Sequence, residues 1–162
     1  EGVVNLSYNY GKQFEKKFAS DFLNTVPNST LDRLYDPMGG YKFITNISDF
    51  IGFSQPSIYY LEIKSHAGNT FPFQNLKQYN KLIKKVNIPG VRAGVVLWFT
   101  SHDKVYYIPI STITKMKEDG KKSIHFKKSI QENYNIIVIP SKKKRVFLDS
   151  DYSVLTELKD GE

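Results

Sequence analysis

The chain has no cysteine, no long apolar run and no recognisable targeting segment. With no cysteine among its 162 residues it has neither disulfide bonds nor thiolate metal sites, which suits a reducing compartment. No apolar stretch approaches the roughly 20 residues that a membrane-spanning helix needs. The opening residues EGVVNLSYNY lack the basic region and the long apolar region of a secretory signal. We therefore expect a protein of the cytoplasm that does not act at a membrane.

Arginine is scarce, although the chain is basic. The net charge is +7 and the pI is near 9.4, which favours a polyanionic partner, most often nucleic acid and less often an anionic membrane. Of the 23 basic residues only Arg33, Arg92 and Arg145 are arginine. Lysine suits phosphate contacts, whereas base-specific recognition relies on the arginine fork. We expect binding through backbone and shape; a lysine-rich, AT-biased genome is the alternative explanation.

Histidine is equally sparse and carries little signal. His66, His102 and His125 are scattered, and no two of them have the spacing of a metal site. Each is therefore expected in a loop or on the surface. His66 follows the candidate site described below and could contact DNA.

Residue periodicity predicts a mixed α/β fold. The length fits one domain over 1–162, and 40% apolar residues are enough for a packed core. The predicted elements are helices over 10–25, 73–86 and 111–120; strands over 29–36, 41–53, 57–65, 92–100 and 104–110; and a C-terminal hairpin from about 134, with strands over 134–140 and 145–149 around a basic loop. Their order indicates one central mixed sheet flanked by helices.

Two of the predicted helices have distinct faces. In helix 10–25 the apolar residues are Phe14, Phe18, Phe22 and Leu23. In helix 73–86 one face is apolar and the other is basic. The apolar residues are Leu76, Tyr79, Ile83 and Val86, and the basic ones are Lys77, Lys81, Lys84 and Lys85. The basic face is a candidate phosphate-binding surface, or simply a solvated face.

The candidate chemistry lies at the end of strand 57–65. Residues two apart share a face of a strand, so Glu62 and Lys64 point the same way. Glu-any-Lys also occurs at 15–17 and 157–159, so the tripeptide alone means little. What distinguishes this copy is Asp49, which lies 13 residues upstream on the preceding strand and would stand beside Glu62 in an antiparallel pair.

Two adjacent carboxylates repel each other unless a cation neutralises them. Oxygen ligands suit Mg²⁺ or Mn²⁺, so Asp49 and Glu62 are candidate metal ligands, with the Ile63 carbonyl as a third. Lys64 would position the attacking water or stabilise the charged phosphate, and Glu15 would add a carboxylate. The alternative is a solvent-facing cross-strand ladder of Asp, Glu and Lys that contributes only a few tenths of a kcal/mol per pair.

Asp49, the LEIK of 61–64 and the GNTFPFQN of 68–75 together resemble the RecU family of Holliday junction resolvases, within the PD-(D/E)xK nuclease superfamily. The resemblance runs from about residue 11 to residue 130 and is closest to phage-borne and shorter members. It implies a restriction-endonuclease-like core. It also implies a homodimer that cuts four-way DNA junctions with Mg²⁺ or Mn²⁺ in a bacterial host cell.

The resemblance also suggests supporting residues. Asn80 stands where cellular members have a glutamine near the metal, and Gln74 and Gln78 are neighbouring candidates. For DNA contacts the candidates are Lys12, Arg33, His66, Lys77, Lys81, Lys84 and Lys85. A restriction-type or repair nuclease of the same fold and a non-catalytic DNA-binding module remain the competing hypotheses.

Overall fold

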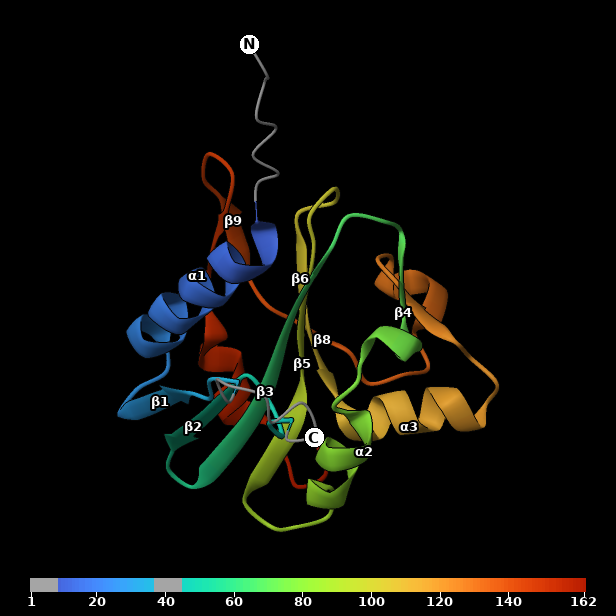
Figure 1. Cartoon of the computed structure of the whole chain (residues 1–162), viewed down its shortest axis with the longest axis horizontal. Coiled ribbons are helices and arrows are strands. Elements are labelled where there is room, and N and C mark those ends of the chain that lie inside the picture. Colours follow the sequence, from blue (N-terminus) through green and yellow to red (C-terminus); the bar gives the residue numbers. More distant parts are fainter. Residues whose placement is uncertain (1–8, 37–44) are drawn as a thin grey trace.

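The centre of the molecule is a six-stranded mixed sheet, seen in a computed structural model that describes residues 9–36 and 45–162 (Figure 1). The strand order is β1-β2-β3-β5-β6-β8. The strands are β1 Ser29–Arg33, β2 Phe50–Ser54, β3 Ser57–His66, β5 Val91–Phe99, β6 Lys104–Pro109 and β8 Ile137–Val138. Neighbours are antiparallel except β3 and β5, which are parallel. The predicted central mixed sheet flanked by helices is confirmed.

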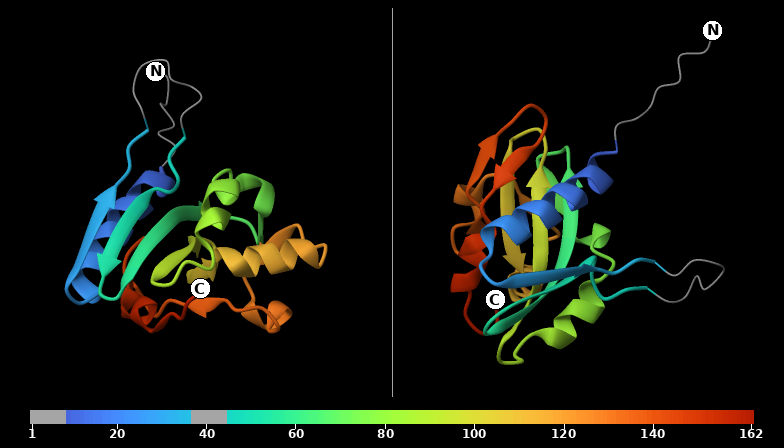
Figure 2. Two further views of the ribbon diagram at one scale, coloured as in Figure 1. Left: turned by 90° about the horizontal axis from the view of Figure 1, so that it is seen from below. Right: turned by 90° about the vertical axis from the view of Figure 1, so that its left-hand side faces the viewer.

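Helix α1, Tyr10–Thr25, covers one face of the sheet, as Figure 2 shows. Asn9 caps the helix by accepting a 3.1 Å hydrogen bond from the Lys12 amide. Phe14, Phe18 and Phe22 recur every fourth residue, so they share one side and are buried. Leu23, predicted for the same face, is instead 49% exposed, because it follows Phe22 by a single residue and so points away from the sheet.

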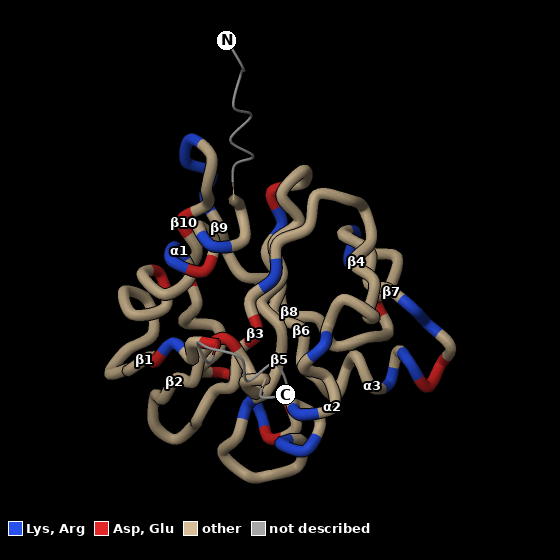
Figure 3. The backbone as a smooth tube through the Cα atoms, viewed as in Figure 1, with Lys and Arg blue, Asp and Glu red and all other residues tan. Residues whose placement is uncertain are grey.

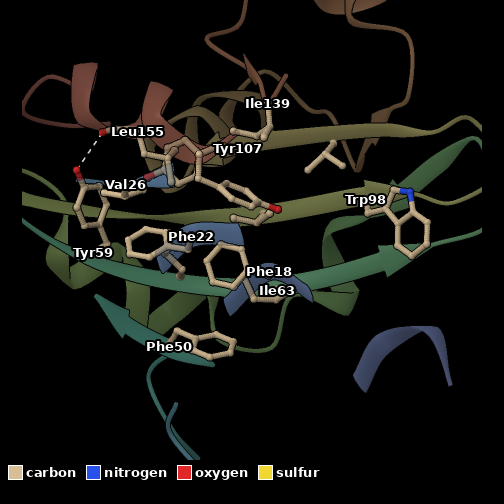
Figure 4. Packing of buried hydrophobic residues seen from close by; sticks show 14 of the residues in the cluster. Phe18, Phe22, Val26, Phe50, Tyr59, Ile63, Trp98, Tyr107, Ile139 and Leu155 are labelled. Carbon is tan, nitrogen blue, oxygen red and sulfur yellow. Dashed lines mark hydrogen bonds between the residues drawn. The ribbon is translucent and has the colours of Figure 1, made fainter. Parts of the chain in front are cut away.

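The core under α1 is largely aromatic (Figure 4). Phe18 and Phe22 pack against Phe50 of β2 and Tyr59 of β3. Tyr59 also donates a 3.0 Å hydrogen bond to the Leu155 carbonyl in the C-terminal 3-10 segment η4, Tyr152–Glu157. The C-terminal segment therefore closes the same core that α1 covers.

The other face of the sheet carries the crossover between β3 and β5. It comprises β4 Thr70–Pro72, the 3-10 turn η1 Phe73–Asn75, the four-residue α2 Tyr79–Leu82 and the 3-10 turn η2 Ile83–Lys85. Helix α3, Ile110–Glu118, packs beside them, and β7, Ser123–His125, pairs with β4. A further 3-10 turn, η3, spans Lys128–Gln131.

The prediction of a single helix over 73–86 is wrong, because the segment divides into η1, α2 and η2. Leu76 leaves the helical region with φ −92° and ψ 80°, which separates η1 from α2. The Phe73 amide donates to the Lys122 carbonyl at 2.9 Å, so η1 is held by a segment far along the chain. Leu82, absent from the predicted apolar stripe, is fully buried.

Several other helices and strands begin or end at residues that differ from those predicted. The strand predicted over 29–36 ends at Arg33. Residues 41–44 of the strand predicted over 41–53, and most of the turn at 36–40, lie outside the described residues; from residue 45 on, the strand begins at Phe50. Helix α3 begins at Ile110, one residue before the predicted Ser111. A short strand, β4, lies in the predicted loop after β3.

The predicted C-terminal hairpin is built from different residues. Of the residues 134–140 expected as its first strand, Ile137 and Val138 form β8, which pairs with β6 in the main sheet. The hairpin consists of β9 Ser141–Lys143, expected as its loop, and β10 Leu148–Ser150. Buried Asp21 of α1 accepts a 3.0 Å hydrogen bond from the Ser150 amide and anchors the hairpin.

Candidate active site

Asp49 lies in a bend directly before β2, the strand that pairs with β3. The β2–β3 ladder ends at the pair Phe50 and Leu61, and one further step in the same register places Asp49 opposite Glu62. Asp49 Oδ2 accepts a 2.8 Å hydrogen bond from the Ile63 amide, while its backbone carbonyl accepts one from Leu34. Asp49 therefore stands beside Glu62, as predicted, although it precedes the strand on which it was expected.

Glu62 is a buried acid with only one partnered oxygen. Its side chain is 1% exposed, and its Oε1 atom lies 3.1 Å from Lys64 Nζ. Oε2 has no hydrogen-bond donor among the described residues. Burial, and then the neighbouring charge of Asp49, raise the pKa of Glu62 to about 8, while Lys64 lowers it. A hydrogen bond between the two acids exists only when one of them carries a proton.

The pair Asp49–Glu62 fits a divalent cation. Glu62 Oε2 is buried without a donor, and a cation beside it would relieve both its desolvation and its repulsion from Asp49. Within 9–36 and 45–162 no group of three or more His, Cys, Asp or Glu residues could hold a metal. Mg²⁺ commonly uses one or two carboxylates and keeps several waters, so two acids suffice.

The Ile63 carbonyl is oriented toward the same place. In an extended strand the N–H and C=O of one residue point to the same side. The Ile63 N–H donates to Asp49, so its carbonyl also points toward the Asp49 side of β3. The Ile63 side chain packs in the core under α1 instead.

Glu15 of α1 and Arg33 of β1 form an ion pair at the border of this site. Partial burial, and then the charge of Asp49, raise the pKa of Glu15, whereas the Arg33 hydrogen bond and the charge of Lys64 lower it. Glu15 is thus within electrostatic reach of Asp49 and Lys64. Arg33, predicted to contact DNA, is engaged by Glu15, and its guanidinium lies 5.6 Å from the centre of the Phe50 ring.

The three amide residues predicted to support the site are not joined to its acids by any hydrogen bond among the described residues. Gln74 and Asn80 are exposed on η1 and α2. Gln78 is half-buried, and its Oε1 atom is shielded from solvent without a donor. The break of the predicted helix at Leu76 explains why these residues do not share one inward face.

The candidate DNA-binding residues differ in exposure. Lys12, Lys77 and Lys84 are exposed. Lys81 donates to the Thr45 carbonyl, and Lys85 lies 5.1 Å from the centre of the Tyr60 ring. Figure 3 shows an acidic and then a basic position along β3, with further basic positions at α2.

The scattered histidines gather at one end of the sheet. His66 contacts the rings of Phe71 and Phe99 edge-on. His102 stacks on Phe126 with ring centres 3.4 Å apart, and His125 stacks on the same ring. Their sequence spacing gives no sign of this, because separate loops and strands supply them.

A comparison with family models shows which family the chain belongs to, independently of the geometry of the site. Residues 40–149, more than half of the chain, match the model of the RecU family, recombination protein U. The chain belongs to the RecU family. The match includes Asp49, Glu62 and Lys64, and it contains the whole crossover from β3 to β5.

The fold of this RecU-family chain is similar to that of a solved resolvase. The structure of Archaeoglobus fulgidus Hjc, a Holliday junction resolvase from an archaeal hyperthermophile, aligns with a TM-score of 0.55 at 14% sequence identity. The alignment covers 76% of this chain and 93% of Hjc. No curated protein gives a significant sequence match. No helix within the described ranges is long and apolar enough to span a bilayer.

Proposed function

We propose that this RecU-family chain is a divalent-metal-dependent endonuclease that resolves four-way DNA junctions as a homodimer. One observation carries the proposal. Buried Glu62 stands beside Asp49; its Oε2 atom has no hydrogen-bond donor, and its Oε1 atom lies 3.1 Å from Lys64 Nζ. Family membership and the likeness to an archaeal resolvase support the junction substrate. The net charge of +7 suits DNA.

Asp49, Glu62 and the Ile63 carbonyl would hold Mg²⁺ or Mn²⁺. When bound, such an ion neutralises the scissile phosphate and lowers the pKa of a water molecule. The backbone hydrogen bonds of Asp49 fix its position, and burial keeps Glu62 away from bulk water. The folded chain therefore holds the two acids together before the metal binds, so the site is preorganised.

Lys64 supplies positive charge next to the reacting phosphate and orients the attacking water. Its ammonium group is held by Glu62, which limits the positions it can take. Glu15 would add a carboxylate at the site border, and its ion pair with Arg33 offsets part of the rise in the pKa of Glu15 that burial causes. The residues that would contact DNA are Lys12, Arg33, His66, Lys77, Lys81, Lys84 and Lys85.

We further propose that residues 1–162 act as one nuclease domain. The protein would be a phage-type member of the family and would act in the cytoplasm of a bacterial host cell. Asp21 and Lys17 of α1 bind Ser150 and Asp149 of the hairpin, so the hairpin is joined to the nuclease core. Within that cell the substrate would be branched DNA that arises during recombination.

The test compares cleavage of a four-way junction with cleavage of a linear duplex of matched sequence, with Mg²⁺ present. Asp49→Asn should lower the cleavage rate at least about 10²-fold and leave junction affinity unchanged, because it removes a metal ligand and no phosphate contact. Asp32→Asn is the matched control, since Asp32 is an exposed acid on the adjacent strand β1.

Three outcomes would contradict the proposal in different ways. Equal cutting of the linear duplex would favour a restriction-type or repair nuclease of the same fold. Undiminished cutting by Asp49→Asn would refute the assigned site. Junction binding without any cutting by the wild-type chain would favour a non-catalytic DNA-binding module.

A further inference from the structure

A basic groove lies outside the candidate active site, between η1 and the segment that joins α3 to β7. It has a volume of about 670 Å³, and its lining includes Gln74, Lys117, Lys121 and Lys122 but no acidic residue. Within the described part of the chain none of these three lysines takes part in an ion pair. Glu118 and Asp119 are exposed in the same segment, but neither lines the groove, and Asp119 accepts a hydrogen bond from the Tyr134 hydroxyl instead. The groove wall itself therefore carries three lysines without a paired acid.

Backbone hydrogen bonds fix the shape of this groove. Gly120 adopts φ +81°, and its amide donates to the Lys117 carbonyl at 3.0 Å. The Lys121 amide donates to the Met116 carbonyl at 2.8 Å, which completes a Schellman motif at the end of α3. The Phe73 amide donates to the Lys122 carbonyl and ties η1 to the opposite wall.

Helix stability does not explain all three lysines. Cations in the last turn of a helix are stabilised by its dipole, which accounts for Lys117. Lys121 and Lys122 lie beyond the helix end and are exposed. Like charges gathered around one groove repel each other, so an anionic ligand would stabilise the arrangement.

The groove continues the basic surface of α2. Lys117 Nζ lies 3.8 Å from the centre of the Tyr79 ring, and the Tyr79 hydroxyl is 2.9 Å from Thr114 Oγ1 of α3. Tyr79 thus joins α2 to α3. Figure 3 shows basic positions on both sides of this junction, at α2 and between α3 and β7.

We propose that the groove of Gln74, Lys117, Lys121 and Lys122 binds the sugar-phosphate backbone of a DNA duplex arm that extends beyond the active site. The three ammonium groups match phosphodiester charge, and the Gln74 amide can donate to phosphate oxygens. The inference rests on the proposed function for its substrate. It gives Gln74, which the FPFQN motif singled out, a role in DNA binding in place of support for the metal site.

The test measures junction affinity in metal-free buffer at several salt concentrations. Lys121→Gln/Lys122→Gln should weaken binding roughly tenfold and reduce the slope of log K against log salt by about 2, because two phosphate contacts are lost. Lys104→Gln/Lys159→Gln removes the same charge at two exposed positions outside the groove and should change affinity less than about twofold. Cleavage at saturating junction should be unchanged in Lys104→Gln/Lys159→Gln, which shows that this control variant is folded and active.

Equal weakening of the two variants would overturn the proposal, since only net charge would then matter. Saturable binding of inorganic phosphate to the wild type, with junction affinity unaffected by Lys121→Gln/Lys122→Gln, would instead identify a small-anion site and also overturn it. A wild-type chain that binds but does not cut would refute the nuclease, while the comparison of the two variants would still decide the groove.

Discussion

Glu62 is the residue at which burial and charge conflict most strongly. Its pKa rises from the ordinary value of 4.5 to about 8, first because the side chain is buried and then because Asp49 is close. The folded state therefore binds more protons than the unfolded state between these two pH values. Consequently, in the absence of metal, the free energy of unfolding falls as the pH rises through that window.

Glu62→Gln should remove this pH dependence. Without metal at pH 8 the variant should be more stable than the wild type by roughly 1–3 kcal/mol, because a buried, unsatisfied charge is gone, and the difference should vanish near pH 4. Urea unfolding in EDTA at both pH values measures it, with exposed Glu157→Gln as control. A wild-type stability that does not fall between pH 5 and 8 would contradict the assigned environment of Glu62.

Mn²⁺ should raise the melting temperature of the wild type more at pH 8 than at pH 5. At the lower pH the metal must displace a proton from Glu62, so its apparent affinity is weaker. In Glu62→Gln the shift should shrink at both pH values. A shift of the same size in wild type and variant would place the Mn²⁺ site elsewhere.

Sequence reasoning succeeded at residues whose partners lie on an adjacent strand. The alternation in β3 and the distance to Asp49 predicted that Asp49 and Glu62 stand side by side, because a short hairpin fixes the register. It missed the ion pair of Arg33 with Glu15, since the first turns of α1 and strand β1 meet only through tertiary packing. The same limitation hid the stacking of His102 and His125 on Phe126.

At the scale of elements, the pattern of burial decided which predictions held. Helix α1 matches the predicted 10–25, because three phenylalanines four residues apart face the sheet. Strand β5 was predicted from its continuous apolar run, and all but its first residue are buried. The helix predicted over 73–86 failed because the bond from Phe73 to Lys122 is a long-range constraint with no local signature.

Gly94 in β5 is required by close packing with β6. A Cβ atom there would lie 2.5 Å from Tyr107 Cε2 and 2.6 Å from the Ile108 carbonyl oxygen. Gly94→Ala should therefore destabilise the fold by about 1–3 kcal/mol through overpacking. Gly11→Ala is the matched control, because its Cβ would meet nothing nearer than 3.6 Å, and a helical alanine should stabilise by about 0.5–1 kcal/mol. Chemical denaturation of both variants gives the comparison, and equal stabilities would contradict this packing.

At the scale of the whole molecule, one face of the sheet forms the main core and the other carries most of the residues that we propose contact DNA. One face packs on α1 and the C-terminal segment and forms the larger aromatic core. The opposite face carries α2, α3 and most of the basic residues that we propose contact DNA. The candidate acids lie where β2 and β3 emerge between these layers, which would let a duplex reach them from the basic side.

Resolution of a four-way junction requires two cuts, and each chain offers one candidate site. We therefore expect the protein to sediment at about twice the 18.7 kDa of the chain, with and without DNA. Analytical ultracentrifugation across a range of protein concentrations measures this. A chain that remains monomeric when bound to a junction would contradict paired cutting.

The central claim is that Asp49 and Glu62 hold a divalent cation beside Lys64. A crystal soaked in Mn²⁺ tests it most directly, because manganese gives an anomalous signal that identifies the ion. The account predicts one anomalous peak in contact with both carboxylates, and no such peak in crystals of Asp49→Asn. Ordered density for both side chains with no anomalous peak between them, or a peak held by other residues, would contradict the claim.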